Sequence, residues 1–325
     1  MPNLHRELID VLADGAFHSG TALSRQLGLS RSAIWKHIQA LGEVGLVIHA
    51  VRGRGYRLAH PLERLDADLI RAQLDPAVQS HIPEIAVDEV VDSTNRRLLQ
   101  APRVAPGTVA LAEFQTAGRG RLGHRWLAPF GGSVCLSVSW QFEEARVLNG
   151  LSLAMAVGLI RALSPFDIKD LALKWPNDLY HRDKKLGGIL LEMSGEAHGQ
   201  CRVVIGIGLN LSLPDSLVHE IDQPATDLRR VIVGPLPGRN RLVAALLNAL
   251  IPILLEFPTS GLAPFLDEWR AFHGFLGRAA DLRIGEASYG GIIEDVTAEG
   301  LLLFRTDQGE QRRVSAGDVR LRVRR

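Results

Sequence analysis

Short apolar runs typical of β-strands recur between residues 85 and 210, and polar or glycine-rich segments adjoin most of them. The predicted strands are Ile85–Val91, Thr108–Phe114, Ser133–Trp140, Leu171–Lys174, Ile189–Met193 and Val203–Ile207. Apolar helices are predicted at Leu148–Leu163, Asn240–Leu255 and Leu262–Phe272. Strands and buried helices in one stretch of chain predict a sheet with helices packed on it, which is an α+β architecture.

The segment Gln115–Trp126, called the Gly/Arg loop below, alternates glycines with cationic side chains. Its glycines are Gly118, Gly120 and Gly123, and its arginines are Arg119, Arg121 and Arg125. Glycine lets a backbone approach a ligand closely, and a guanidinium group binds carboxylate or phosphate oxygens in pairs. The pattern predicts a loop that becomes ordered over a small anion. A solvated basic turn is an equally open alternative from this segment alone.

Polar groups also follow the strand Ile85–Val91. Ser93, Thr94 and Asn95 carry hydroxyl and amide groups that suit a polar ligand. Asp92 or Ser93 could instead simply cap the helix that comes next. This segment alone therefore leaves both a ligand-binding and a purely structural interpretation open.

Two further segments place functional groups beside strands. Pro176 directs the chain out of its strand into a turn, which leaves Asn177 and Asp178 at the strand end. Lys185 follows shortly before a Gly-Gly pair, where it could contact an anion or remain a solvated hairpin lysine. The glycines of Gly206–Asn210 stand at alternate positions, so this strand could face a flat ligand closely.

Residues 1–60 form a basic segment on a chain whose net charge is only +1. They hold seven Lys or Arg against four Asp or Glu, which indicates a nucleic-acid-binding appendage. A helix is predicted at residues 4–12, a second helix ends at Gly28, and Ser30 is the predicted N-cap of a third helix, Arg31–Leu41. Two helices joined by a glycine turn, the second with a polar outer face, are typical of a helix-turn-helix.

Two predicted strands, Leu46–Val51 and Tyr56–Leu58, flank an Arg-Gly-Arg-Gly turn that could reach phosphates or the minor groove. The side chains predicted to contact DNA are Ser30, Arg31, Ser32, Trp35, Lys36, Arg52 and Arg54. A small helical bundle that binds protein is the alternative, and the basic helix and arginine-tipped hairpin favour DNA. Trp35 suits either a base edge or a protein interface.

The pattern changes again in the last 50 or so residues, where short strands alternate with turns. These strands are predicted at Ala280–Ile284, Ala287–Val296, Leu301–Arg305, Gln311–Val314 and Val319–Val323. Such a series predicts a small β-barrel. The predicted domain limits are 1–63, 64–272 and 273–325.

Composition excludes several classes of protein. With 46% hydrophobic and 22% charged residues, the chain has the composition of an ordinary soluble globular protein. The longest uncharged run, residues 126–142, is too short and too broken by Pro and Gly for a membrane span. The first residues lack the apolar core of a signal peptide, and Cys135 and Cys201 make no disulfide framework. No membrane association and a cytoplasmic location are therefore expected.

Five motifs occur in a fixed order through the central part of the chain. They are Ser93–Asn95, Gln115–Arg121, Lys174–Asp178, Lys185–Leu190 and Gly206–Asn210. In this order they resemble the biotin–protein ligases, of the bifunctional kind that is also the biotin operon repressor, and the resemblance covers essentially the whole chain. It implies an N-terminal winged helix-turn-helix, a central mixed sheet with helices related to class II aminoacyl-tRNA synthetases, and a C-terminal SH3-like barrel.

The resemblance also implies a reaction. Biotin and ATP would give biotinyl-5′-AMP, and biotin would then pass to one lysine of the biotin carboxyl carrier protein of acetyl-CoA carboxylase. The adenylate-bound form would dimerise and bind operator DNA to repress biotin synthesis genes. Mg²⁺ is expected with ATP, but the sequence does not identify its ligands. A biotin-sensing repressor without ligase activity and a lipoate ligase are the alternatives; the intact loop and Lys185 favour the ligase.

Adenylation brings an anionic carboxylate to an anionic phosphate, so fixed cations are needed. The candidate catalytic residues are Lys185, Arg119, Arg121 and Asp178, of which Asp178 would orient or accept the proton of the acceptor lysine. By the resemblance, the groups that hold biotin or the adenylate are Ser93, Thr94, Asn95, Gln115, Gly118, Gly120, Trp126, Gly188, Gly206, Asn210 and Arg322. Leu122 and His124 stand where relatives often carry arginines, so this loop is less cationic.

Overall fold

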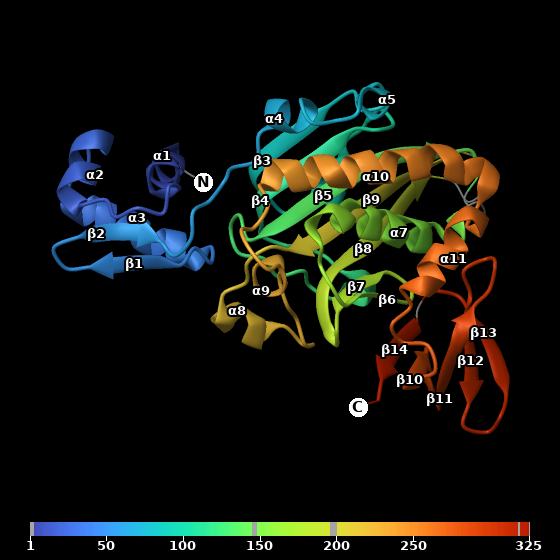
Figure 1. The fold of residues 1–325 in the computed structure, drawn as a ribbon. Coiled ribbons are helices and arrows are strands. Elements are labelled where there is room, and N and C mark those ends of the chain that lie inside the picture. Colours follow the sequence, from blue (N-terminus) through green and yellow to red (C-terminus); the bar gives the residue numbers. More distant parts are fainter. Residues whose placement is uncertain (1–2, 145–147, 196–199, 318, 325) are drawn as a thin grey trace.

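The structure is a computed structural model, and it describes residues 3–144, 148–195, 200–317 and 319–324. Its strands form three separate sheets of two, seven and five strands. Figure 1 shows the small N-terminal sheet and its helices at one end, the large sheet in the middle and the C-terminal sheet beyond it. The predicted α+β multidomain architecture is confirmed, whereas the residue limits of the domains stay a prediction.

The N-terminal part is a helix-turn-helix followed by a two-stranded wing. Its elements are α1 (Asn3–Leu12), α2 (Gly20–Leu27), α3 (Arg31–Glu43), β1 (Ile48–Val51) and β2 (Gly55–Leu58). Helix α2 ends at Gly28, whose φ of 66° lies in the left-handed region that glycine tolerates. The Ser30 hydroxyl accepts a hydrogen bond from the backbone N–H of Ala33 at 3.2 Å and so caps α3. The predicted helices, the Ser30 cap and the hairpin are thus confirmed.

The core of the N-terminal part includes one side chain from the central part of the chain. This core consists of Leu8, Ile9, Leu12, Leu23, Ile34, Ile38, Leu41, Leu58 and Phe130. Phe130 comes shortly after the Gly/Arg loop, and its backbone N–H donates to the Val44 carbonyl at 2.9 Å. Burial of such an aromatic ring contributes about 2–3 kcal/mol, so Phe130 anchors the N-terminal part next to the loop.

The central sheet has seven strands in the order β3-β4-β5-β9-β8-β7-β6. They are β3 (Ile85–Val91), β4 (Val109–Gln115), β5 (Ser133–Phe142), β6 (Leu171–Lys174), β7 (Asp178–His181), β8 (Lys184–Gly195) and β9 (Cys201–Asn210). Strands β3 and β4 run parallel, and the other neighbouring pairs run antiparallel. The sheet is therefore mixed, as the resemblance implied.

Two of these strands are longer than the sequence predicted. Strand β8 already begins at Lys184, and β9 continues to Asn210. The glycines between the apolar runs resemble turn signals, yet Gly188 lies directly opposite Gly208 in a continuous β8–β9 ladder. Pairing with neighbouring strands overrides the local preference of glycine against β-structure. Lys185 consequently lies within a strand, and the expectation that it precedes the strand is wrong.

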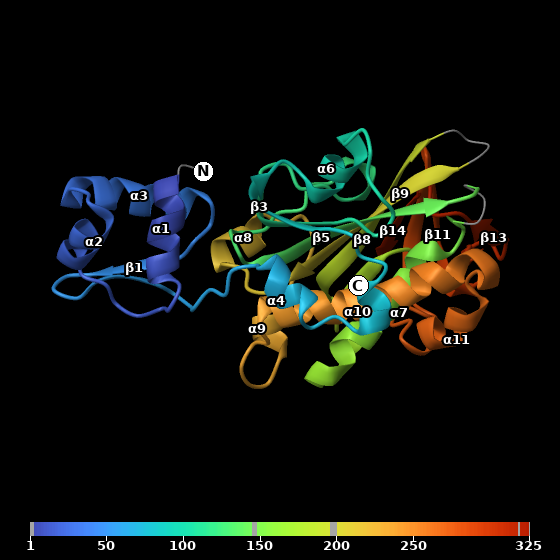
Figure 2. The same cartoon turned by 90° about the horizontal axis from the view of Figure 1, so that it is seen from above.

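Helices cover both faces of the central sheet. Figure 2 shows α6 (Thr94–Gln100) on one side, and α7 (Leu151–Leu163) and α10 (Arg239–Ser260) on the other. The remaining helices are α4 (Ala67–Arg71), α5 (Pro76–Gln79), α8 (Asp215–Glu220), α9 (Leu228–Val231) and α11 (Ala263–Ala271), with 3-10 turns at Arg121–Gly123 and Ser164–Phe166. The sequence did not predict α5, α8 or α9, because helices of only four to six residues are too short to show a periodic apolar pattern.

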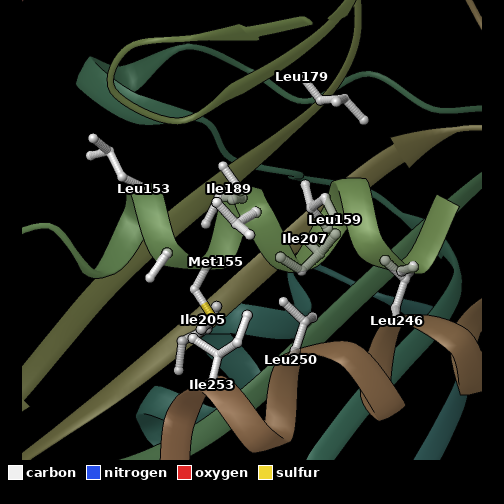
Figure 3. Packing of buried hydrophobic residues seen from close by; sticks show 14 of the residues in the cluster. Leu153, Met155, Leu159, Leu179, Ile189, Ile205, Ile207, Leu246, Leu250 and Ile253 are labelled. Atoms are coloured by element: carbon white, nitrogen blue, oxygen red, sulfur yellow. The ribbon is translucent and has the colours of Figure 1, made fainter. Parts of the chain in front are cut away.

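The main hydrophobic core lies between α7, α10 and the sheet. In Figure 3, Met155 of α7 and Ile253 and Leu250 of α10 lie close to Ile205 and Ile207 of β9. By length and composition alone α10 could cross a membrane, but 56% of its apolar window is buried and it packs against α7 and β5. Helix α10 is therefore the core helix of a globular domain.

Both cysteines are free and buried in this core region. Burial raises the pKa of the Cys135 thiol to about 12, so this side chain stays neutral. Both cysteines thus pack as small apolar side chains.

The C-terminal part is a five-stranded antiparallel sheet in the order β13-β12-β11-β10-β14. Its strands are β10 (Ala279–Ile284), β11 (Ala287–Val296), β12 (Leu302–Thr306), β13 (Gln311–Val314) and β14 (Val319–Val323). Each lies within one residue of its predicted limits. Short strands between well-defined turn pairs have few alternatives, which is why the sequence alone located them.

Candidate active site

The Gly/Arg loop folds back on itself beside the central sheet. The backbone N–H of Gly120 donates to the His124 carbonyl at 2.7 Å, and that of Trp126 donates to the Gly118 carbonyl at 2.9 Å. At the tip, Leu122 has a φ of 54°, which is unusual for a side chain other than glycine. The loop is thus a tight hairpin, closed by backbone hydrogen bonds of Gly118 and Gly120.

The loop encloses a cavity of about 680 Å³ against strand β8. The cavity is lined by Arg96, residues 116–125, residues 190–192 and Gly317 of the C-terminal part. Its size is within the range of small-molecule sites. Because Gly118, Arg119, Gly120 and Arg121 all line it, the geometry favours the anion-binding loop over a solvated turn.

A buried polar network lies at the base of the loop. The Gln115 Oε1 accepts from the backbone N–H of Thr94 at 2.8 Å, while the Ser137 hydroxyl lies 2.7 Å from Thr94 Oγ1 and 2.6 Å from Asn95 Oδ1. The Ser93 hydroxyl accepts from the backbone N–H of Arg96 and so caps α6, which agrees with the purely structural interpretation of Ser93. Sequence reasoning missed Ser137, because a serine in an alternating strand suggests a solvent-facing position. Thr94, Asn95 and Gln115 are thereby brought together, as the site prediction required.

The glycines of β9 allow side chains to approach the sheet closely. A Cβ at Gly206 would overlap Asn95 Oδ1, and a Cβ at Gly208 would lie 2.5 Å from the Trp126 ring. Only glycine fits such approaches. The predicted close approach is therefore present in the fold, with Asn95 and Trp126 as the neighbours.

Lys185 and Asp178 form a largely buried ion pair. Their Nζ and Oδ1 atoms are 2.6 Å apart, and the two side chains are 18% and 17% exposed. Both lie next to Gly188, where a Cβ would come within 3.2 Å of the Asp178 carboxylate. The Lys185 amine is also 6.0 Å from the Trp126 ring centroid. A solvated hairpin lysine is excluded by this burial.

Three predicted site residues, the catalytic candidate Arg121 and the binding candidates Asn210 and Arg322, have other partners or lie elsewhere. Asn210 donates from Nδ2 to the Thr226 carbonyl at 3.0 Å and does not line the cavity. Arg121 lines the cavity, but its guanidinium donates to backbone carbonyls of the C-terminal part, including that of Gly317 at 3.0 Å. Arg322 is exposed on β14 and is not among the residues that line the cavity. Asn210 and Arg322 thus lie outside this cavity, as do Lys185, Asp178, Trp126 and the segment Ser93–Asn95.

Glu192 is a site residue that sequence reasoning missed. It lies on β8, lines the cavity, and pairs with the Arg119 guanidinium at 2.8 Å. It also accepts from Asn95 Nδ2 at 2.8 Å. The sequence did contain one signal for Glu192, a single carboxylate inside an otherwise apolar strand. Burying such a charge is costly unless it has partners, so its presence indicates that partners exist.

The residues predicted to contact DNA all lie on the surface. Ser30, Arg31, Ser32, Trp35 and Lys36 at the start of α3 are exposed, as are Arg52 and Arg54 in the wing turn. Trp35 is 53% exposed, which is unusual for a tryptophan and indicates a contact surface. The start of α3 and the wing turn thus both present exposed polar and basic groups.

Comparison with known proteins covers all three parts of the chain. A helix-turn-helix domain model matches residues 5–57, the biotin/lipoate A/B protein ligase family matches residues 87–210, and the biotin protein ligase C-terminal domain matches residues 275–322. The bifunctional ligase/repressor BirA of Salmonella typhimurium is 38% identical over 97% of this chain and 96% of its own length. The chain belongs to the bifunctional biotin ligase/repressor family. The resemblance inferred from the five motifs is confirmed.

Other members of the biotin ligase family agree with this assignment. BirA of Escherichia coli is 37% identical over 93% of this chain and 92% of its own length. A biotin protein ligase from Aquifex aeolicus, solved in complex with biotin and ATP, is 28% identical with a TM-score of 0.64. That structure matches 75% of this chain and 100% of its own. The ligase fold of the family therefore extends over the central and C-terminal parts here.

Proposed function

We propose that the chain is an ATP-dependent biotin–protein ligase that also represses transcription. It joins the biotin carboxylate to the α-phosphate of ATP with release of pyrophosphate, and then transfers biotin to a lysine of the biotin carboxyl carrier protein of acetyl-CoA carboxylase with release of AMP. In the same chain, the helix-turn-helix binds operator DNA of biotin synthesis genes. The two buried free cysteines suit a reducing cytoplasm as the place of action.

The observation that carries the ligase proposal is the convergence of distant motifs on one face of the central sheet. The Thr94 backbone N–H donates a hydrogen bond to the Gln115 side chain, and the side chains of Asn95 and Trp126 pack against the backbone of Gly206 and Gly208. Within the described residues, Trp126 Nε1 and Arg119 Nε are buried donors that lack an acceptor. Such donors are costly unless a partner arrives, and the oxygens of biotin or its adenylate would supply one.

Adenylation requires positive charge where the biotin carboxylate meets the α-phosphate of ATP. Arg119 and Arg121 line the cavity, and Lys185 lies beneath the Trp126 end of the loop. Their partial burial lowers the local dielectric, so these cations stabilise developing charge more strongly than in water. We assign charge stabilisation to these three groups, with Gly118 and Gly120 giving backbone access.

Transfer requires that the acceptor lysine lose a proton before it attacks the adenylate. Asp178 lies next to Gly188 and already holds the Lys185 ammonium at 2.6 Å. A carboxylate in this position can orient an incoming ammonium or accept its proton. We assign this role to Asp178.

Mg²⁺ is expected to accompany ATP. No group of three or more His, Cys, Asp or Glu side chains suited to a metal occurs in the described ranges. The residues present thus fit an ion carried mainly by phosphate oxygens, which is how Mg²⁺ commonly binds. Bound there, it would neutralise part of the phosphate charge.

Biotin-dependent exchange of pyrophosphate into ATP tests the ligase half directly. We expect exchange with biotin and none with lipoate, because only the matching acid reaches the α-phosphate productively. Exchange with lipoate at an equal rate would instead indicate a lipoate ligase. Biotin binding without any exchange would favour a biotin-sensing repressor and refute the ligase proposal.

Deletion of residues 1–63 tests the repressor half. The truncated chain should lose gel-shift binding to the promoter region of biotin synthesis genes but retain some ligation. Partial loss of ligation is expected because the deletion exposes Phe130, which is buried in the N-terminal core. The matched full-length variant Arg52→Ala, Arg54→Ala should lose DNA binding with ligation unchanged. DNA binding by the truncated chain would place the DNA site elsewhere.

We further propose that the adenylate-bound form is a homodimer. Strand β7 pairs with β8 as far as Gly188, and Asn177 and Asn95 bond to Ile189 and Leu190 beyond it, so no described strand covers the outer edge of residues 191–195. Met193 on this stretch is exposed. A free strand edge with an exposed apolar side chain favours pairing with a second copy. Sedimentation of the gel-shift samples, with and without biotin and ATP, reports this association.

A further inference from the structure

Glu192 stands out because it places a negative charge in a site that must bind anions. Its side chain is 23% exposed and lines the cavity under the Gly/Arg loop. A carboxylate there repels both the biotin carboxylate and the phosphates of ATP. Such a residue is tolerated in a site of this kind only if its local contacts compensate for the repulsion.

The contacts of Glu192 join two parts of the site that are far apart in sequence. One of its oxygens lies 2.8 Å from Arg119 Nη2 in the loop, and the other accepts from Asn95 Nδ2 at 2.8 Å at the start of α6. Arg119 Nη2 is also 2.9 Å from this second oxygen, so both oxygens face the guanidinium. The two oxygens share one guanidinium nitrogen, and such a charge-assisted contact is stronger than a neutral hydrogen bond.

The bond to Asn95 also decides which way its amide points. Because Nδ2 donates to Glu192, Oδ1 must face Ser137, whose hydroxyl lies 2.6 Å away, and the surface of Gly206. The opposite orientation would place an NH₂ group against the Ser137 hydroxyl and an oxygen against the carboxylate. Together with the Leu190 carbonyl, which also accepts from Nδ2 at 3.3 Å, Glu192 thus fixes the Oδ1 acceptor beside Gly206, and it also holds the Arg119 cation at the cavity.

We propose that Glu192 is a positioning residue for adenylation. It holds the Arg119 guanidinium and the Asn95 amide in the orientations that receive the substrate, and it acts through them without touching the reacting atoms. This inference rests on the ligase function proposed above. It explains why the strand keeps a charge at a cavity for anions.

A double-mutant cycle tests the proposal. The variants are Glu192→Gln, Arg119→Gln and the double variant, each measured by biotin-dependent pyrophosphate exchange with separate kcat and KM for biotin and ATP. Glutamine keeps the shape and one acceptor oxygen, but it removes the negative charge and replaces the oxygen that faces Arg119 Nη2 at 2.8 Å with an NH₂ group. We expect Glu192→Gln to lower kcat/KM for biotin by roughly 10-fold or more. In the Arg119→Gln background the same change should have less than about a 3-fold effect, because the partner is already absent.

Two further variants make the result decisive. Glu256→Gln removes an exposed carboxylate on α10 and should leave exchange unchanged. Glu192→Asp keeps the charge with a shorter reach and should recover part of the lost kcat/KM. Equal rates for Glu192→Gln and Glu256→Gln, fully multiplicative losses in the cycle, or tighter biotin binding by Glu192→Gln would each overturn the proposal. Absence of exchange in the unmodified chain would instead refute the ligase function itself.

Discussion

Replacing Lys185 by glutamine is expected to reduce biotin-dependent pyrophosphate exchange by roughly 10²–10³-fold, with the fold intact. The amine is largely buried beside Trp126 and is held by Asp178 at 2.6 Å. In such a place a cation stabilises the charge that develops on the phosphate without first shedding a full water shell. Glutamine is of similar length and can still donate to Asp178, so the loss would reflect charge rather than packing.

The neighbouring lysine provides a matched control for this experiment. Lys184 is exposed and adjacent in the same strand, so Lys184→Gln removes the same charge from the surface and should leave exchange unchanged. Preformed biotinyl-5′-AMP separates the two half-reactions. Its transfer to the carrier protein should be affected far less by Lys185→Gln than exchange is. Normal exchange by Lys185→Gln would remove Lys185 from the adenylation step.

Replacing Arg239 by methionine is expected to destabilise the protein by about 3–5 kcal/mol. Arg239 and Glu113 form an ion pair at 2.5 Å with exposures of only 5% and 1%. Glu113 Oε1 also accepts from the backbone N–H of Leu65, where the chain enters the central domain. Methionine would leave the buried Glu113 carboxylate with only the more distant Arg64 guanidinium, 3.9 Å away, and a poorly compensated buried charge is far costlier than a lost surface contact.

Thermal unfolding followed by circular dichroism measures this effect. At roughly 2–4 °C per kcal/mol for a domain of this size, Tm should fall by about 6–20 °C. Adding Glu113→Gln to the Arg239 variant should recover part of the loss, because it removes the unpaired charge. Arg161→Met breaks the more exposed pair with Glu268 and should cost less than about 1 kcal/mol. If Arg239→Met and Arg161→Met lowered Tm equally, burial of the Arg239–Glu113 pair would not contribute to stability.

Much of the fold was predictable because its signals are local. The Ser30 cap and the glycine that ends α2 act over three or four residues, and both occur where the sequence indicated them. The C-terminal strands were located for the same reason. The extensions of β8 and β9 through their glycines were not, because they depend on the strand across the ladder.

The candidate site shows the same division. Arginines, glycines and hydroxyls in five short motifs indicated a site for biotin and a nucleotide. Their meeting around Asn95 depends on the order of strands in the sheet. Glu192 carried only the signal of a single carboxylate in an apolar strand, and nothing in its own segment marks Ser137. Contacts from α6 and the loop reveal the role of both.

The sequence by itself determined the three-part organisation, the helix-turn-helix and the identity of the motifs, since these follow from short-range periodicity, capping and residue chemistry. Only the tertiary structure decided which partners those motifs have. It paired Arg119 with Glu192 and Lys185 with Asp178, and it placed Phe130 in the N-terminal core. The physical reason is that ion pairing and burial depend on distances in space, and the chain acquires those distances only when its sheet is assembled.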